Sequence, residues 1–137
     1  MTLVKEIRAR DFMVTKPVLF TRDMDLLDAV SVLIDRRISG APVVDERGNL
    51  VGVLTERDFL KAALVAGYHG ESGGCVADYM THEVQAVNAD DSLLDVAMGF
   101  AETKYRGFPV MEDNRVVGYV TRRQVLRAVI DTFGTSR

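Results

Sequence analysis

The chain has 137 residues, of which 47% are hydrophobic and 27% are charged, and its net charge is −3. This composition is ordinary for a globular chain that forms one compact domain or two tightly joined small ones. The sequence has no basic tract of the kind that nucleic acid requires, no apolar run long enough to span a membrane and no secretory apolar segment. We therefore expect a cytoplasmic protein that binds neither nucleic acid nor membrane.

The first half of the chain predicts a short helix, a strand, a helix, a hairpin and a second helix. These elements cover residues 3–13, 17–20, 23–36, 41–54 and 55–66. Asp23 is the predicted N-cap of the first long helix, whose apolar residues recur at helical spacing. Thr55 and Asp58 have the spacing of a capping box at the start of the last helix, and Gly67 is placed to end it.

The second half of the chain repeats the first. Asp11 matches Asp78, and the two stretches stay in register until the counterpart of Gly48 is missing, after which the matches resume up to Ala62 and Ala128. Asp90 is the matching predicted N-cap. We predict a first repeat over residues 8–66, a linker over 67–74 and a second repeat over 75–134. A repeat of this size buries too little surface to be robust alone, so the two should share a core.

Two short motifs occur once in each repeat. The first reads S-G-A-P-V-V-D at 39–45 and R-G-F-P-V-M-E at 106–112; the second reads G-V-L-T-E-R-D at 52–58 and G-Y-V-T-R-R-Q at 118–124. A duplicated β-α-β-β-α unit with these motifs resembles the cystathionine-β-synthase (CBS) domain family over about residues 8–130. The resemblance implies an α/β (α+β) fold in which the two repeats pack with pseudo-two-fold symmetry into one Bateman module.

The resemblance also implies a regulatory binding module and not an enzyme. Bateman modules bind adenosine-containing ligands such as AMP, ADP, ATP or S-adenosylmethionine in clefts between the repeats. They often form homodimers, and a chain without an attached enzyme would act on a separate partner protein. The alternative is an assembly or interaction module without a nucleotide ligand, which the capping-box interpretation of both threonine motifs favours.

Asp58 is the strongest candidate for a ligand contact. Its two carboxylate oxygens suit the vicinal hydroxyls of a ribose, and the start of the helix beside it offers N–H groups to a phosphate. The same residues also explain a helix cap that needs no ligand. With the base pocket that the resemblance implies, the predicted nucleotide-binding residues are Thr15, Lys16, Pro17, Ile38, Ser39, Ala41, Pro42, Thr55, Arg57 and Asp58.

The second repeat departs from this pattern because Gln124 stands where the first has Asp58. A neutral amide offers no charged acceptor to a diol, and a hydrogen bond to a charged group is worth about 1.5–3 kcal/mol. We therefore predict a weaker, empty or different second site. Its candidate residues are His82, Tyr105, Arg106, Phe108, Pro109, Thr121, Arg122, Arg123 and Gln124.

The remaining chemistry-bearing residues give little support to other functions. Cys75 is the only cysteine, which excludes an internal disulfide and a CxxC metal site. His82 and Glu83 lie apart from any second histidine cluster, so we predict no metal site. The sequence contains no pattern of a nucleophile with an activating base and no phosphate-binding glycine loop, so we predict no catalytic residues.

Overall fold

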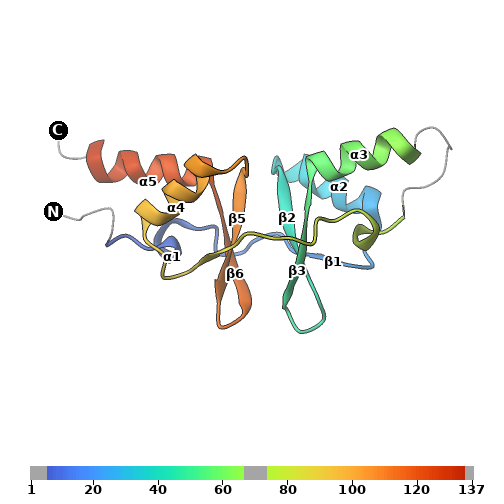
Figure 1. Ribbon diagram of the computed structural model, residues 1–137, viewed down its shortest axis with the longest axis horizontal. Helices are drawn as coiled ribbons and strands as arrows, with labels where there is room; N and C mark the ends of the chain where they lie inside the picture. Colours follow the sequence, from blue (N-terminus) through green and yellow to red (C-terminus); the bar gives the residue numbers. More distant parts are fainter. Residues whose placement is uncertain (1–5, 67–73, 135–137) are drawn as a thin grey trace. The chain divides into compact units, whose positions relative to one another are not determined.

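The computed structural model describes residues 6–66 and 74–134, and the chain divides into two compact units. Val18–Val84 make up the first, which we call the Asp58 unit. Met1–Pro17 and Gln85–Arg137 make up the second, which we call the Gln124 unit. Each unit is a mixed α/β structure with one three-stranded sheet (Figure 1), so the predicted fold class is confirmed.

The Asp58 unit contains a strand, a crossover helix, a hairpin and a second helix. In chain order its elements are β1 (Phe20–Thr21), α2 (Leu26–Arg36), β2 (Gly40–Val44), β3 (Leu50–Thr55), α3 (Glu56–Ala66) and a 3-10 helix (Val76–Asp78). The sheet order is β1-β2-β3, with β1 parallel to β2 and β2 antiparallel to β3. Because β1 and β2 are parallel, the chain needs a crossover between them, and α2 provides it.

The Gln124 unit repeats this plan. Its elements are α1 (Ala9–Phe12), β4 (Val87–Asn88), α4 (Leu93–Glu102), β5 (Gly107–Glu112), β6 (Arg115–Thr121) and α5 (Arg122–Gly134). The sheet order is β4-β5-β6, with the same parallel and antiparallel pairs. Asp113 and Asn114 alone connect β5 to β6, with φ of 51° and 65°. Positive φ at both central residues is the geometry of a two-residue hairpin turn, and this explains how the second hairpin dispenses with a counterpart of Gly48.

Each unit combines the larger part of one repeat with the segment that leads into the other repeat's first strand. We call residues 6–17 the first leading segment, which belongs to the Gln124 unit, and residues 74–84 the second leading segment, which belongs to the Asp58 unit. Each segment exchanges three backbone hydrogen bonds with the chain around the start of a long helix. These are Leu93 N–H to Ile7 C=O, Ala9 N–H to Asp91 C=O and Arg10 N–H to Ala89 C=O, matched by Leu26 N–H to Gly74 C=O, Val76 N–H to Met24 C=O and Ala77 N–H to Arg22 C=O.

A second contact fixes the far end of each leading segment. Val14 pairs with Tyr119 of β6, and Thr81 pairs with Val53 of β3, each through two backbone hydrogen bonds of 2.8–3.1 Å. Both leading segments therefore bond to a strand as well as to the chain before a helix. Because buried backbone groups must be paired, these bonds fix where each segment lies.

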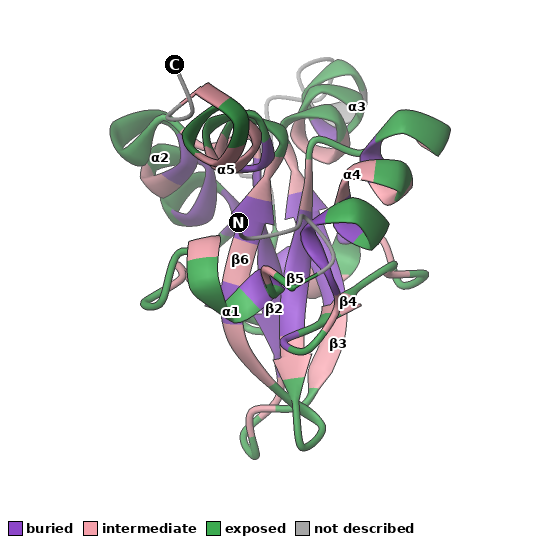
Figure 2. Ribbon diagram, turned by 90° about the vertical axis from the view of Figure 1, so that its left-hand side faces the viewer, coloured by how far each residue is buried: buried purple, intermediate pink, exposed green. Residues whose placement is uncertain are grey.

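Each unit also has its own apolar core (Figure 2), in which the buried residues line the strands and the helix faces turned toward them. Leu33 and Leu54 pack in the core of the Asp58 unit, and Leu93 and Val120 in that of the Gln124 unit. The leading segments contribute fully buried residues at matching positions. These are Ala9 in the Gln124 unit and Val76 in the Asp58 unit.

The helix starts differ from the prediction. Asp25 and Ser92 are the N-caps of α2 and α4, accepting hydrogen bonds from the N–H groups of Asp28 and Asp95 at 3.1 Å, so the prediction of Asp23 and Asp90 was wrong. Asp25 and Ser92 are extended, and the N–H groups of Leu26 and Leu93 bond to the leading segments, so each N-cap lies two residues later than predicted. The short strands also start later than predicted. They pair with β2 and β5 only at Phe20–Thr21 and Val87–Asn88.

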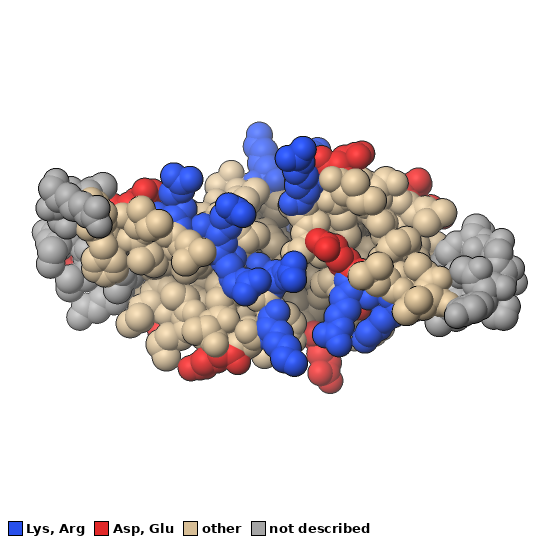
Figure 3. All heavy atoms as spheres, turned by 90° about the horizontal axis from the view of Figure 1, so that it is seen from above, with Lys and Arg blue, Asp and Glu red and all other residues tan. Residues whose placement is uncertain are grey.

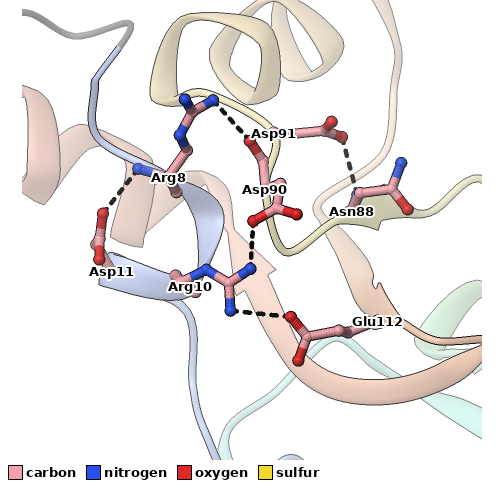
Figure 4. Close-up of polar contacts among 7 residues, drawn as sticks. All are labelled: Arg8, Arg10, Asp11, Asn88, Asp90, Asp91 and Glu112. Carbon is pink, nitrogen blue, oxygen red and sulfur yellow. Dashed lines mark hydrogen bonds and ion pairs between the residues drawn. The ribbon is translucent and has the colours of Figure 1, made fainter.

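Among the described residues, ion pairs strengthen the hold on the first leading segment but not on the second (Figure 4). The Arg10 guanidinium bonds the carboxylate of Asp90 and, at 2.9 Å, that of Glu112, while Arg8 Nη1 donates to the Asp90 carbonyl at 2.9 Å. The hydrogen bond from Arg10, followed by its charge, lowers the pKa of Asp90, and the same bond raises the pKa of Arg10. Ala77 stands at the matching position of the second leading segment and carries no charge.

Arg10→Ala should raise the pKa of Asp90 toward its ordinary value, because the largest cause of its depression is removed. A depressed folded-state pKa stabilises the fold at neutral pH, and this stabilisation is lost as the pH falls through the acid range. Carboxyl chemical shifts followed by NMR during an acid titration would measure the change. The pKa of Asp45, which the N–H of Asn49 lowers most, is the internal control and should not move; an unchanged Asp90 titration would contradict the assignment.

Candidate functional site

The Thr55–Asp58 motif forms a reciprocal capping box where β3 ends and α3 begins. Asp58 Oδ2 accepts hydrogen bonds from the Thr55 N–H and the Thr55 hydroxyl, both at 3.0 Å. Thr55 Oγ1 in turn accepts the N–H of Asp58 at 3.2 Å. The carboxylate is half-buried and held in one orientation at the start of a helix. The capping interpretation of this motif is therefore confirmed.

Thr81 adds a third donor to this carboxylate. Its hydroxyl donates to Asp58 Oδ1 at 2.9 Å, and its backbone is fixed by the pairing with Val53. A carboxylate has about four acceptor positions on its two oxygens, so Oδ1 keeps one for a further donor. We did not identify Thr81 from the sequence. The one available signal was that this position differs between the repeats, with Val14 as its counterpart.

The structure brings the predicted Ile38–Pro42 segment beside the capping box. Gly40 pairs with Thr55 across the hairpin, and the Ser39 carbonyl accepts the N–H of Glu56, the first residue of α3, at 2.9 Å. Ala41 and Pro42 are buried within the sheet, and Ile38 packs against the core. Arg57 is exposed on the first turn of α3. Of these residues, Ser39 is joined to the start of α3 by a backbone hydrogen bond.

The Gln124 unit builds the matching box from a neutral amide. Gln124 Oε1 accepts the N–H of Thr121 at 2.7 Å and its hydroxyl at 3.2 Å, and Thr121 Oγ1 accepts the N–H of Gln124 at 3.4 Å. Val14 stands where the other unit has Thr81, so no hydroxyl is available for a third bond. The Gln124 box therefore has one uncharged acceptor oxygen with two donors, whereas the Asp58 carboxylate has two charged oxygens with three donors.

The two helix starts also differ in charge. The first turn of α3 carries Glu56 and Asp58, whereas that of α5 contains no acid and begins with Arg122 and Arg123. Both arginines are exposed, and Lys and Arg side chains project from each unit on the side seen in Figure 3. The Arg122 N–H donates to the Arg106 carbonyl at 3.4 Å, so these two predicted residues are neighbours.

Some of the remaining predicted site residues lie in a different unit from the central residue of their predicted site. Thr15, Lys16 and Pro17 follow Val14 and belong to the Gln124 unit, whereas His82 follows Thr81 and belongs to the Asp58 unit. Phe108 and Pro109 are buried in β5, and the ring of Tyr105 lies 5.7 Å from that of Phe108. Grouping Thr15–Pro17 with Asp58, and His82 with Gln124, stays a prediction.

Residues 6–66 and 74–134 also bear on metal binding and on membrane spans. No group of three or more His, Cys, Asp and Glu side chains in this part of the chain could hold a metal ion. In the same residues, no helix is both long enough and apolar enough to cross a membrane.

Tyr119 was not predicted from the sequence, and it lies next to the Thr121–Gln124 box. Its ring covers Gly107, and burial raises the pKa of its hydroxyl to about 12. Val53 is its counterpart in the Asp58 unit. The signal that could have identified Tyr119 is again a difference between matched positions.

Thr81→Val should lower the free energy of unfolding by about 1.5 kcal/mol, the lower end of the range for a bond to a charged group, because it removes one hydrogen bond to a carboxylate that is only half-buried and keeps the side-chain volume. Chemical denaturation would measure this loss. Thr81→Ser keeps the hydroxyl and is the matched control, which should stay close to wild type. Equal losses in the two variants would contradict a role for the hydroxyl.

Alkaline titration of phenolate absorbance should show one tyrosine that ionises at about pH 12, and Tyr119→Phe should remove it. Since burial favours the neutral phenol, the unfolded chain releases this proton first, and the associated stability falls as the pH rises above the ordinary value of 10.0. Tyr105→Phe, which alters an exposed tyrosine, should leave this component in place. Loss of the component in Tyr105→Phe instead would overturn the assignment.

Curated relatives of the chain include larger proteins. CBS domain-containing protein CBSX1 of Arabidopsis thaliana, a chloroplastic protein, is 30% identical over an alignment of 149 residues that covers 90% of this chain and 61% of the relative. The chain spans less than two thirds of the length of the first curated relatives that it matches, from 14% to 61%.

Solved structures match over nearly the whole chain. CBSX2 of Arabidopsis thaliana in complex with AMP is 30% identical, with a TM-score of 0.81 over 92% of this chain and 98% of that one. The CBS domain pair of protein MJ0100 in complex with 5′-methylthioadenosine and S-adenosyl-L-methionine is 29% identical, with a TM-score of 0.77 over 95% and 98%. The family model of the CBS domain matches residues 9–65 and again 76–131. The chain therefore belongs to the CBS domain family and contains two CBS domains in tandem.

Proposed function

We propose that the chain is a regulatory module that binds an adenosine-containing nucleotide through Asp58 and passes the signal to a separate partner protein. The ligand class comprises AMP, ADP, ATP and S-adenosylmethionine. The observation that carries the proposal is the Asp58 carboxylate, which three donors hold in one orientation at the first turn of α3. A carboxylate fixed in this way is ready to accept hydrogen bonds from ribose hydroxyls without reorganising its own side chain.

The surroundings of Asp58 suit the other parts of such a ligand. Arg57 is exposed on the first turn of α3, where its guanidinium is available to pair with a phosphate. The carbonyl of Ser39 and the backbone around Gly40 lie beside Thr55, where backbone groups could read a base. Two relatives with the same pair of domains were solved with AMP and with S-adenosyl-L-methionine, which supports the ligand class.

The signal would arise from a difference in affinity. A ligand can shift a conformational equilibrium only by as much as it binds one arrangement more tightly than the other. The second leading segment is the element of the Asp58 unit best placed to respond, because Thr81 shares the carboxylate with the ligand. A partner protein that contacts this segment would then bind with a different affinity when the ligand is present.

A homodimer is part of the proposal, because helices α3 and α5 expose large apolar side chains. Leu60, Leu64, Leu126, Ile130 and Phe133 are each 61–68% exposed. Apolar patches of this kind on a small protein commonly mark an interface. The same observation favours the alternative function, an assembly or interaction module that binds no nucleotide.

A thermal-shift panel of AMP, ADP, ATP, S-adenosylmethionine and GMP tests the proposal. A ligand at 100 times its dissociation constant should stabilise the fold by about 2.7 kcal/mol, and Asp58→Ala should abolish this shift. Gln124→Ala is the matched control, because it removes the same kind of helix cap from the other unit, at a cost of about 1 kcal/mol, and should keep the ligand response.

The outcomes separate the two functions. A shift with an adenosyl compound that Asp58→Ala loses and Gln124→Ala retains identifies the ligand and supports the sensor. An absence of any shift in the wild-type protein contradicts nucleotide sensing and leaves the assembly module as the function to test.

A further inference from the structure

Tyr119 is much larger than the residue at the matching position beside the other capping box. It replaces Val53 of the other repeat, and it lies two residues before Thr121 on β6, so the two side chains are on the same face of the strand. Gly107 pairs with Thr121 across the hairpin. Tyr119, Gly107 and the Thr121–Gln124 box are therefore neighbours within one unit.

The Tyr119 ring fills the space over Gly107. A Cβ atom placed on Gly107 would lie 2.5 Å from Cε2 and from the hydroxyl oxygen of Tyr119, and 2.7 Å from Cζ. No side chain could occupy that position while the ring is there. The main chain of Tyr119 is also fixed, because its N–H and C=O both bond to Val14, so only rotation of the side chain could vacate the space.

At the matching position of the Asp58 unit, no ring atom is among the three nearest atoms of the described residues. The atoms nearest to a Cβ placed on Gly40 are the Leu54 carbonyl oxygen and the Thr55 methyl group, both at 3.1 Å. Val53 is buried and contributes none of the three nearest atoms. Beside Asp58, the strand pair thus presents backbone and a methyl group where the Gln124 unit presents a phenol.

We propose that Tyr119 closes the Gln124 unit to an adenosyl group, so that the chain binds one such ligand, at Asp58. The ligand class rests on the function proposed above. Two changes act together in the Gln124 unit. Gln124 removes the charged acceptor for the ribose, and the Tyr119 ring takes the room beside the strand pair that the ligand would need.

The surroundings of Tyr119 favour a ring that stays in place. The side chain is half-buried, and its ring atoms lie directly against the Gly107 backbone. Rotation outward would expose the apolar ring and leave a void over Gly107. A competing role for Tyr119 is a platform on which a second base stacks, and this role predicts two ligands per chain.

Isothermal titration with AMP and with S-adenosylmethionine tests the proposal through the number of ligands bound. The wild type should bind one of them at one molecule per chain, and Asp58→Ala should bind none. In the Asp58→Ala background, Gln124→Asp alone should still bind none. Adding Tyr119→Val should restore one molecule per chain, at least tenfold tighter than the matched variant with Tyr119→Phe, which keeps the ring.

The reverse substitution gives an independent measurement if the Tyr119→Val variants do not fold. Val53→Tyr introduces the ring beside Asp58 and should weaken binding of the same ligand at least tenfold, with the fold checked by circular dichroism. Val53→Ile is its control and should bind within about twofold of wild type, since it adds only one methylene.

Several results would overturn the role of Tyr119. They are binding in Asp58→Ala/Gln124→Asp with Tyr119 present, absence of binding in the folded variant that also carries Tyr119→Val, unchanged affinity in Val53→Tyr, and two ligands per wild-type chain. A wild-type chain that binds neither compound contradicts the proposed function itself. The two failures are therefore distinguishable.

Discussion

The exchange of leading segments is the constraint on which the rest of the structure depends. The backbone groups just before α2 and α4 find their partners on the leading segment of the other repeat, through three hydrogen bonds in each unit. Unpaired backbone groups in these places would be costly, so each repeat needs a segment that lies far away in the sequence. Ala9 and Val76 add a fully buried side chain to each core, which makes the dependence apolar as well as polar.

The same exchange decides what stands beside each capping box. It places Thr81 next to Asp58 and Val14 next to the strand that leads to Gln124. Three matched positions then differ between the Asp58 unit and the Gln124 unit. A carboxylate becomes an amide, a threonine becomes a valine, and the small Val53 becomes the large Tyr119. The Asp58 unit has a charged carboxylate with a third donor beside it, whereas the Gln124 unit has a neutral amide and a ring over Gly107.

Local patterns predicted the parts of the fold that local interactions determine. The helical stripes predicted α2 and α4, the apolar runs on both sides of two turns predicted both hairpins, and the Thr-x-x-Asp and Thr-x-x-Gln spacings predicted capping boxes that the structure contains. The N-caps and the short strands were misplaced because distant segments set them. Thr81 and Tyr119 escaped notice for the same reason, since a bond across 23 residues and a ring over a facing strand leave no local pattern.

A capping role for Asp58 does not compete seriously with a binding role. Oδ2 already accepts two bonds and Oδ1 accepts one, so one ligand hydroxyl can bond to Oδ1 with every protein contact kept. A second ligand hydroxyl would have to displace a neutral donor, at a net cost of about 1 kcal/mol. Micromolar binding corresponds to about 8 kcal/mol, so this cost is a small part of the whole. Gln124 caps its helix equally well but has one neutral oxygen that already accepts two bonds. The difference between the repeats therefore lies in spare acceptor capacity and charge, and not in which helix is capped.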